Sequence, residues 1–308
     1  MTSSSSLGTE FYFHCAVAVI GVVGTAANAL ILYAMWASKQ HKKQVLIFNQ
    51  NVLDFFSSFF MVVSYSLKLC NIHLSGSVGY WLCMMLLSDS LIWTGAVGSV
   101  INLGSITIER YLKVVHPISS KKKLHNWVIY SAMTFSWIGS FIYNAALVFP
   151  TTAVLDGACH PYVIWNSETE GMISFIYSLV SFYIIILLIF VYCYWRILIV
   201  IRRQARVMAI HNANGPSAAQ HINNQIQANV IKTMIFVSAF YAISWLPHYI
   251  YVMYMTVSPN VIFVDFGYYV ALSVAFLYTC TNPFVYATKF DPVKQVLLGL
   301  IHCKKTTQ

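Results

Sequence analysis

The sequence predicts an all-α membrane protein, a seven-transmembrane helix bundle followed by a short amphipathic eighth helix. The chain of 308 residues is 58% hydrophobic and only 9% charged, whereas soluble domains contain about 25% charged residues. Seven apolar runs reach the roughly 20 residues that a helix needs to cross a bilayer. These runs are apolar on all faces and longer than the alternating strands of a membrane barrel, so they indicate helices.

The seven runs follow one another along the whole chain, separated by polar connections. We expect transmembrane helices at residues 11–36, 45–69, 84–112, 126–149, 171–203, 226–255 and 261–287, and an amphipathic helix at residues 290–302. This divides the chain into an N-terminal tail (1–10), a seven-helix domain (11–287) and an amphipathic helix with a C-terminal tail (288–308). The longest polar connection contains Gly215 and Pro216 and predicts a flexible loop.

The placement of charge predicts the orientation of the bundle. Seventeen of the 18 Lys and Arg residues fall in or beside the first, third and fifth connections and the C-terminal tail, and only Lys68 falls on the opposite side. By the positive-inside rule, the N-terminus is extracellular and the C-terminus cytoplasmic. The net charge of +9 is therefore mainly a topology signal, which suits anionic inner-leaflet lipid better than nucleic acid.

The third run ends with two adjacent charged residues, Glu109 and Arg110. Charges at the edge of a membrane are energetically expensive and usually functional. An isolated arginine there could equally snorkel to lipid phosphate. Residues elsewhere in the chain indicate whether Glu109 and Arg110 form a functional ion pair or an interfacial anchor.

The sequence Glu109-Arg110-Tyr111 resembles the Asp/Glu-Arg-Tyr signature of the rhodopsin-like (class A) G-protein-coupled receptors. Further residues match the motifs of that family on the other helices, namely Asn28 in the first, Asp54 in the second, Trp137 in the fourth, Trp245 and Pro247 in the sixth, and Asn282, Pro283 and Tyr286 in the seventh. Six signatures in order on six helices extend the resemblance over essentially the whole chain.

The resemblance implies a plasma-membrane receptor that couples an extracellular ligand to a heterotrimeric G protein, with arrestin as a further partner. It implies that the coupling and switch residues are Glu109, Arg110, Tyr111, Tyr194, Gln227, Asn282, Pro283 and Tyr286. Pro247 and Pro283 remove helix hydrogen bonds and predict kinks, and Trp245 lies at the resulting hinge. Gln227 stands where some members carry an acid that pairs with the arginine, which predicts a weaker resting restraint and ligand-free signalling.

Asp54 is the only acid deep within an apolar run. A buried carboxylate must find a cation, hydrogen-bond donors or a proton. The resemblance implies a sodium ion held by Asp54 and Ser99, with Asn282 nearby. A neutral acid within a hydrogen-bonded network is the alternative, and no other metal or cofactor is expected.

Two groups of cysteines have different expected roles. The resemblance implies a disulfide between Cys83, before the third helix, and Cys159, between the fourth and fifth helices, on the oxidising side of the membrane. Cys303 follows the amphipathic segment, where palmitoylation and a free thiol are both consistent with the sequence.

The candidate ligand pocket is mostly aromatic with a few polar groups, as ligand sites tend to be. Its residues are Asp89, Ile92, Trp93, Ser178, His248, Tyr249 and Phe276. Ile92 stands where amine receptors keep an aspartate, and Phe276 where opsins carry the retinal lysine, so neither class fits. A peptide or small amphipathic molecule is favoured, and Asp89 leaves a cationic ligand as the alternative.

Three features depart from the family pattern. Cys83 and Arg110 are 27 residues apart, a longer spacing than is usual in the family. Ile186 replaces the proline of the fifth helix, and Tyr241 replaces a phenylalanine of the sixth.

A transporter or channel is the alternative function, with Asp54 as its charge at the membrane midplane. The chain has no repeat relating its two halves and no broken helices in corresponding positions, which argues against that alternative. An enzyme is not expected, because no two catalytic-type residues share a helix face at a useful depth.

Overall fold

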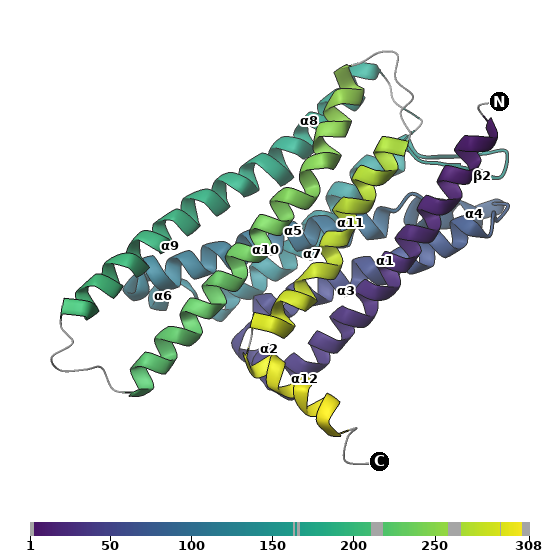
Figure 1. The fold of residues 1–308 in the computed structure, drawn as a ribbon. Helices are drawn as coiled ribbons and strands as arrows, with labels where there is room; N and C mark the ends of the chain where they lie inside the picture. Colours follow the sequence, from purple (N-terminus) through teal and green to yellow (C-terminus); the bar gives the residue numbers. More distant parts are fainter. Residues whose placement is uncertain are drawn as a thin grey trace.

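A computed structural model of the chain shows a bundle of long helices arranged side by side (Figure 1). Seven of the helices in the described part of the chain are long and apolar enough to cross a membrane, so the predicted fold class is confirmed. The structure leaves undescribed residues 1–2, 163, 165–166, 211–217, 258–265, 290 and 304–308, and the side chains of residues 3–7, 168, 205–210, 218–230, 255–257, 289, 291–292 and 301–303.

The spanning helices agree with the seven apolar runs. They lie within α1 (Ser3–Ala37), α3 (Val45–Leu69), α4 to α5 (Gly76–Leu82 and Ser90–Val115), α7 (Asn126–Thr151), α8 to α9 (Glu168–Ser178 and Ile185–Ile210), α10 (Ala218–Val257) and α11 (Phe266–Lys289). The shorter helices are α2 (Gln40–Lys43), α6 (Pro117–Lys123) and α12 (Asp291–Cys303). Helix α12 turns away from the direction of α11 (Figure 1) and agrees with the predicted eighth helix.

Several helices extend beyond their predicted ends. Helix α1 already begins at Ser3, within the segment predicted as a tail. Helices α9 and α10 extend into the long connection between them, because its Ala, Gln and Arg residues favour helix even outside the membrane. Gly215 and Pro216, where a flexible loop is predicted, lie outside the described residues.

Two π-helical segments interrupt the spanning helices. The segment η1 (Cys83–Leu87) follows α4, and η2 (Leu179–Ile184) joins α8 to α9. After η1 the chain breaks at Asp89, which has left-handed backbone angles (φ 61, ψ 17). A π-turn accommodates an additional residue within a helix, so η1 and the break together explain the long spacing between Cys83 and Arg110.

A short antiparallel hairpin connects α7 to α8. Strands β1 (Ala153–Leu155) and β2 (Ala158–His160) pair with Val154 opposite Cys159. Asp156 and Gly157 form the turn with positive φ values of 50 and 76, as a two-residue type I′ turn requires. The sequence analysis did not predict these strands, although the Asp-Gly pair was the available signal.

The hairpin is tied to the outer end of the bundle at two points. Cys83 and Cys159 form a disulfide with Sγ atoms 1.98 Å apart, which confirms the implied pairing. The backbone N–H of Leu74 donates to the Gly157 carbonyl oxygen at 2.8 Å. A Cβ atom on Gly157 would lie 1.9 Å from Cε1 of His73, so this close contact also requires glycine.

Helix α5 lies close to both α3 and α7 because two of its residues are glycines. A Cβ on Gly95 would lie 2.7 Å from the Ser57 Cβ in α3, and one on Gly98 would lie 2.8 Å from the Ser136 carbonyl oxygen in α7. Small residues allow membrane helices to approach at short distance. The close approach brings polar side chains of three helices within hydrogen-bonding range at the centre of the bundle.

We predict that Gly157→Ala destabilises the outer end of the bundle. Left-handed backbone angles destabilise a non-glycine residue by about 1–2 kcal/mol, and the added methyl group would collide with His73. Thermal unfolding of the purified protein should show a lower melting temperature, and His73→Ala should restore part of the loss in the double variant. An unchanged melting temperature for Gly157→Ala would contradict this account of the turn.

Candidate functional site

The centre of the bundle holds a fully buried carboxylate. Asp54 in α3 is 0% exposed. The Ser99 hydroxyl of α5 donates to its Oδ1 at 2.7 Å, and the Asn282 amide of α11 donates to its Oδ2 at 2.5 Å. The structure therefore brings together the three residues predicted for the sodium site and joins three helices through one side chain.

A fourth residue belongs to this centre, and the sequence analysis missed it. Gln50 is 0% exposed and lies one helical turn before Asp54, on the same face of α3. Its side-chain amide donates to Ser99 Oγ, the hydroxyl that in turn donates to Asp54 Oδ1. The sequence contained a signal for this contact. Residues four apart are neighbours on a helix, and Gln50 is a polar residue four positions before Asp54 in the same apolar run.

Sodium at Asp54 stays a prediction. A hard cation is bound by several oxygen lone pairs directed at one point. Ser99, Asn282 and Gln50 instead direct hydrogens at the carboxylate or its nearest hydroxyl. The residues fit a carboxylate that is satisfied by donors, and a cation would have to displace at least one of them.

An aromatic cluster lies on the outer side of this centre. The Trp93 ring centroid lies 5.9 Å from that of Trp245, 5.8 Å from His248 and 5.8 Å from Phe276. Within the described part of the chain, the buried Nε1 of Trp245 and Nδ1 of His248 have no hydrogen-bond partner. An indole N–H is a donor only, so this cluster contains a buried donor that has no protein acceptor in the described part of the chain.

The other predicted pocket residues divide into two groups. The Ser178 side chain hydrogen-bonds Tyr249, whose ring centroid lies 6.1 Å from that of Trp245, so both residues adjoin the cluster. Ile92 is buried among residues of α1, α3 and α11. Ile92 therefore supports the wall of the pocket, and its side chain contributes no polar group.

Asp89 is already paired with a cation of the protein. Both of its carboxylate oxygens lie 2.7 Å from Lys68 Nζ, and the side chains of Lys68 and Asp89 are only 18% and 15% exposed. The Tyr65 hydroxyl donates to Asp89 at 3.2 Å, and Lys68 Nζ lies 4.2 Å from the centre of the Tyr65 ring. The break at Asp89 turns this carboxylate toward α3.

Tyr162, which follows β2, interacts electrostatically with Asp89 of this ion pair. Tyr162 lies near Asp89, and burial, with a smaller contribution from that carboxylate, raises the pKa of the Tyr162 hydroxyl. The phenol therefore stays neutral at physiological pH. From the sequence, Lys68 is only an exception to the charge pattern. Its partner becomes known only from the contact between α3 and the start of α5.

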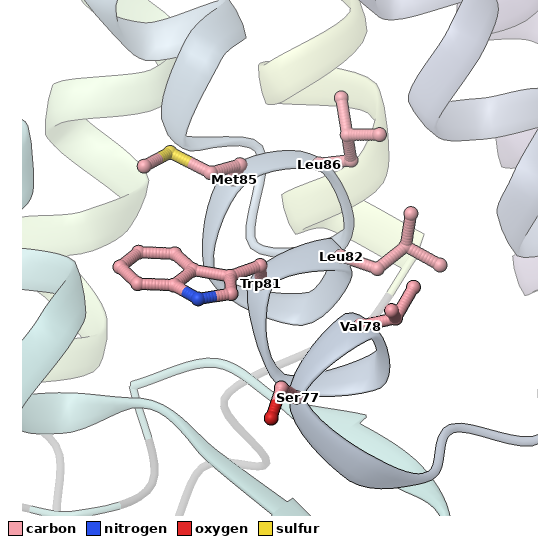
Figure 2. Close-up of a pocket in the computed structure, with 6 residues that line it drawn as sticks. All are labelled: Ser77, Val78, Trp81, Leu82, Met85 and Leu86. Atoms are coloured by element: carbon pink, nitrogen blue, oxygen red, sulfur yellow. The ribbon is translucent and has the colours of Figure 1, made fainter.

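A surface groove of about 450 Å³ lies elsewhere, on α4 and η1 (Figure 2). Its lining residues are Ser77, Val78, Trp81, Leu82, Met85 and Leu86. All six residues come from the continuous stretch α4–η1. Among their side chains, only the Ser77 hydroxyl and the Trp81 indole N–H are hydrogen-bonding groups. This groove is separate from the aromatic cluster and contains none of the predicted site residues.

At the opposite end of α5, Arg110 is held by two neighbours. Its Nε lies 3.6 Å from Glu109 Oε2, and its guanidinium donates to the Gln44 side-chain oxygen at the start of α3. Glu109 is also paired with Lys113 at 2.5 Å. Gln44 was not predicted, because this contact joins residues 66 positions apart in the sequence.

The remaining switch residues near this end are described only in part. Gln227 and Cys303 lie in α10 and α12, but their side chains are outside the described residues, so their predicted roles stay predictions. The Tyr111 hydroxyl contacts His116 Nε2 at 3.2 Å and therefore points toward the helix end. The Tyr286 hydroxyl is buried with no hydrogen-bond partner in the described part of the chain.

Three tyrosine hydroxyls tie α10 to its neighbours. The Tyr194 hydroxyl of α9 lies 3.0 Å from the Thr107 hydroxyl of α5 and 3.1 Å from the Ser238 hydroxyl of α10. The Tyr183 hydroxyl of η2 donates to the Ala242 carbonyl at 2.8 Å, and the Tyr241 hydroxyl donates back to the Phe182 carbonyl. We call the reciprocal pair of Tyr183 and Tyr241 bonds the tyrosine latch.

Two departures from the family pattern are related through this latch. Ile186 stands where a proline is expected, and the π-turn η2 immediately precedes it. A π-turn changes the hydrogen-bond pattern of the backbone carbonyls around it. Tyr241, the second departure, supplies a hydroxyl to one of these carbonyls, which phenylalanine could not do.

Comparisons with known proteins agree with this arrangement. A family model described as "7 transmembrane receptor (rhodopsin family)" matches residues 27–286. The substance-K receptor of Mus musculus is 22% identical over 86% of this chain and 68% of that receptor. Melanin-concentrating hormone receptor 1 of Macaca mulatta is 26% identical over 92% of this chain and 78% of that receptor.

Further similarities are to a melanopsin by sequence and to a rhodopsin by fold. Melanopsin-A of Gadus morhua is 23% identical over 93% of this chain, which spans 52% of that protein. The crystal structure of squid rhodopsin matches with a TM-score of 0.75 over 95% of this chain and 86% of that one, at 16% identity. At this low identity the structural match demonstrates the shared fold.

We predict that Tyr241→Phe destabilises the bundle at the tyrosine latch. The variant keeps the ring and removes the donor to the Phe182 carbonyl, and a buried acceptor left unsatisfied is destabilising by about 1–3 kcal/mol. The melting temperature of the purified protein should fall. Tyr254→Phe is the matched control, because Tyr254 is 56% exposed, and equal effects of both variants would contradict the latch.

Proposed function

The chain belongs to the rhodopsin family of seven-transmembrane receptors, and from this premise we propose how it couples an extracellular ligand to a heterotrimeric G protein. The arrangement that supports the proposal most is the series of contacts from the aromatic cluster through the tyrosine latch to Tyr194 and Thr107, about one helical turn before Arg110. This family consists of receptors rather than enzymes, and the transporter alternative is not favoured.

Ligand binding would act first on the aromatic cluster. Trp245 stands two residues before Pro247 in α10, and proline removes the hydrogen bond that would otherwise stiffen the helix there. A ligand that accepts a hydrogen bond from Trp245 Nε1 would satisfy a buried donor and shift the rings that pack on it. A ligand changes the populations of two states only through such differential contacts.

The movement would then pass along α10. The tyrosine latch lies next to Trp245, and the Tyr194 contact with Ser238 lies about one turn further along the helix. We propose that the latch acts as the pivot and that the Tyr194 contact breaks when the cytoplasmic half of α10 moves outward. This uses hinge motion between packed helices, a common form of switching.

The outward movement would free the cleft around Arg110 for the G protein. In the described structure, Glu109 and Gln44 restrain the guanidinium, and both lie outside α10. The restraint therefore has to be broken by the G protein itself or by a shift of α3 relative to α5. We further propose a plasma-membrane location, an extracellular N-terminus, arrestin as a second cytoplasmic partner, contact with membrane lipid and palmitoylation of Cys303.

The proposed ligand is a peptide or a small amphipathic molecule. Two of the relatives are named as receptors for substance K and melanin-concentrating hormone, and the aromatic cluster suits an apolar group with a hydrogen-bond acceptor. A ligand bearing a single positive charge is disfavoured, because binding to Asp89 would leave Lys68 partly buried without its partner.

We predict that activation of a heterotrimeric G protein depends on Arg110 and is restrained by Gln44. Guanine-nucleotide exchange should be measured with receptor in lipid vesicles, first without ligand and then with a panel of peptides and monoamines. Gln44→Ala should raise basal exchange by up to about tenfold, because a hydrogen bond to a charged group is lost. Arg110→Ala should abolish exchange, and Gln227→Glu should lower its basal rate.

Gln40→Ala is the matched control for this experiment. Gln40 lies one helical turn before Gln44, and its side chain makes no hydrogen bond in the described part of the chain. All variants are compared at equal receptor amounts. Normal exchange by a folded Arg110→Ala protein would reject the proposed coupling site, and activation by monoamines alone would reject the proposed ligand class.

We predict that the Lys68–Asp89 pair contributes to stability as a unit. Lys68→Met and Asp89→Asn should each lower the melting temperature, because either change leaves a partly buried charge unpaired, at about 3 kcal/mol. The double variant should recover most of the loss, since no charge then remains. Additive losses in the double variant would show that the two charges do not depend on each other.

A further inference from the structure

A chain of hydrogen bonds between side chains connects α7 to Asp54. It begins at the Trp137 indole N–H, which donates to Asn49 Oδ1 at 3.0 Å. The Asn49 amide donates to Asn102 Oδ1 at 2.9 Å, and the Asn102 amide donates to Gln50 Oε1 at 2.8 Å. The Gln50 amide donates to Ser99 Oγ, whose hydroxyl donates to Asp54 Oδ1.

The chemistry of the two ends determines the direction of this chain. An indole N–H can only donate, and an ionised carboxylate can only accept. The Asn49 oxygen must therefore face Trp137, and each following amide must turn its oxygen toward α7 and its nitrogen toward Asp54. Asn102 has a second reason for this orientation, because its amide also donates to the Leu46 carbonyl at 2.9 Å.

The consequence is that Gln50 presents its NH₂ group to Ser99 Oγ, the hydroxyl that donates to the buried carboxylate. Rotating this amide by half a turn would place its nitrogen against the Asn102 amide nitrogen and its oxygen against Ser99 Oγ, whose hydrogen is already donated to Asp54. Both contacts would be repulsive in a site that is 0% exposed at Gln50, Asp54 and Asn102. The hydrogen-bonded chain therefore holds the positive end of the Gln50 amide at the position where a cation would approach Asp54 and Ser99.

We propose that Gln50 is a specificity-determining residue that opposes sodium binding at Asp54. Its amide hydrogen occupies a lone pair of Ser99 Oγ that a sodium ion would use, and the positive end of the amide repels the ion electrostatically. Asp54 is then held by Ser99 and Asn282, with Gln50 fixing the direction of the Ser99 hydroxyl, and sodium binds weakly. The inference rests on the proposed sodium site and assigns the residue that sets its affinity.

Gln50→Leu tests this proposal with little change in volume. The variant removes the amide near Asp54, while Asn102 keeps its bond to the Leu46 carbonyl, so the far part of the hydrogen-bonded chain remains satisfied. Gln50→Ala is a second variant that leaves room for an ion and water if leucine packs poorly. Trp137→Phe is the control, because it removes the far end of the chain, while the Asn102 bond to the Leu46 carbonyl still orients Gln50 toward Ser99.

The measurement is the melting temperature of the purified full-length receptor, titrated with sodium chloride against choline chloride at constant ionic strength. Gln50→Leu should show a sodium-specific rise whose half-saturating concentration is at least about tenfold lower than in the wild type, as expected for the loss of a hydrogen bond to a charged group. Trp137→Phe should respond like the wild type. Asp54→Asn, combined with Gln50→Leu, should abolish the gained response.

Three outcomes would overturn the proposal. Equal half-saturating concentrations in the wild type and in Gln50→Leu would show that sodium binds but that Gln50 does not oppose it. A gained response that survives Asp54→Asn would place the ion elsewhere. No sodium response in any variant would reject the site itself, while leaving G-protein activation, which is measured separately, unaffected.

Discussion

The buried carboxylate of Asp54 constrains the centre of this receptor, because it must be satisfied by donors that water cannot supply. Ser99 of α5 and Asn282 of α11 reach it, and they can do so only where three helices approach closely. The glycines of α5 allow that approach. The same proximity brings the amides of Asn49, Gln50 and Asn102 into one network. Close helix packing and hydrogen bonding to Asp54 therefore depend on each other at this centre. A movement of α5 or α11 must change both.

Irregular backbone and unusual side chains compensate for one another elsewhere in the bundle. The π-turn η2 takes the place of a proline kink, and the Tyr241 hydroxyl bonds a carbonyl within it. The π-turn η1 and the left-handed Asp89 lengthen the outer end of the third spanning segment, and the same break directs the Asp89 carboxylate to Lys68. In each case a local departure from helix geometry is accompanied by a specific polar contact to the next helix.

The charged groups around Asp89 and those around Glu109 differ in which of them remain available to a partner. Lys68 and Asp89 satisfy each other at the start of α5, so this site presents little net charge to a ligand. At the other end of α5 Glu109 is shared between Arg110 and Lys113, and Gln44 supplies a neutral acceptor to the guanidinium. The arginine is therefore held by weaker contacts than a second carboxylate would give. Such a restraint suits a residue that must exchange its partners during signalling.

The amino-acid sequence by itself determined the seven helices, their order, the disulfide cysteines and the positions of Asp54, Arg110 and Trp245. The helices follow from the length of apolar runs, and Asp54 and Arg110 from their charge in an apolar environment. The disulfide pairing and Trp245 follow from the resemblance to the receptor family. Gln44, Gln50 and Lys68 could not be assigned in this way, because a polar residue at a helix position does not reveal which distant atom it meets. Only the tertiary structure decided that Gln50 turns its amide toward Ser99 and Asp54, since the direction depends on Asn102, a residue on another helix whose amide also donates to the Leu46 carbonyl. The physical reason is that a hydrogen-bonded network acquires its orientation from its ends, and helix packing brings those ends together.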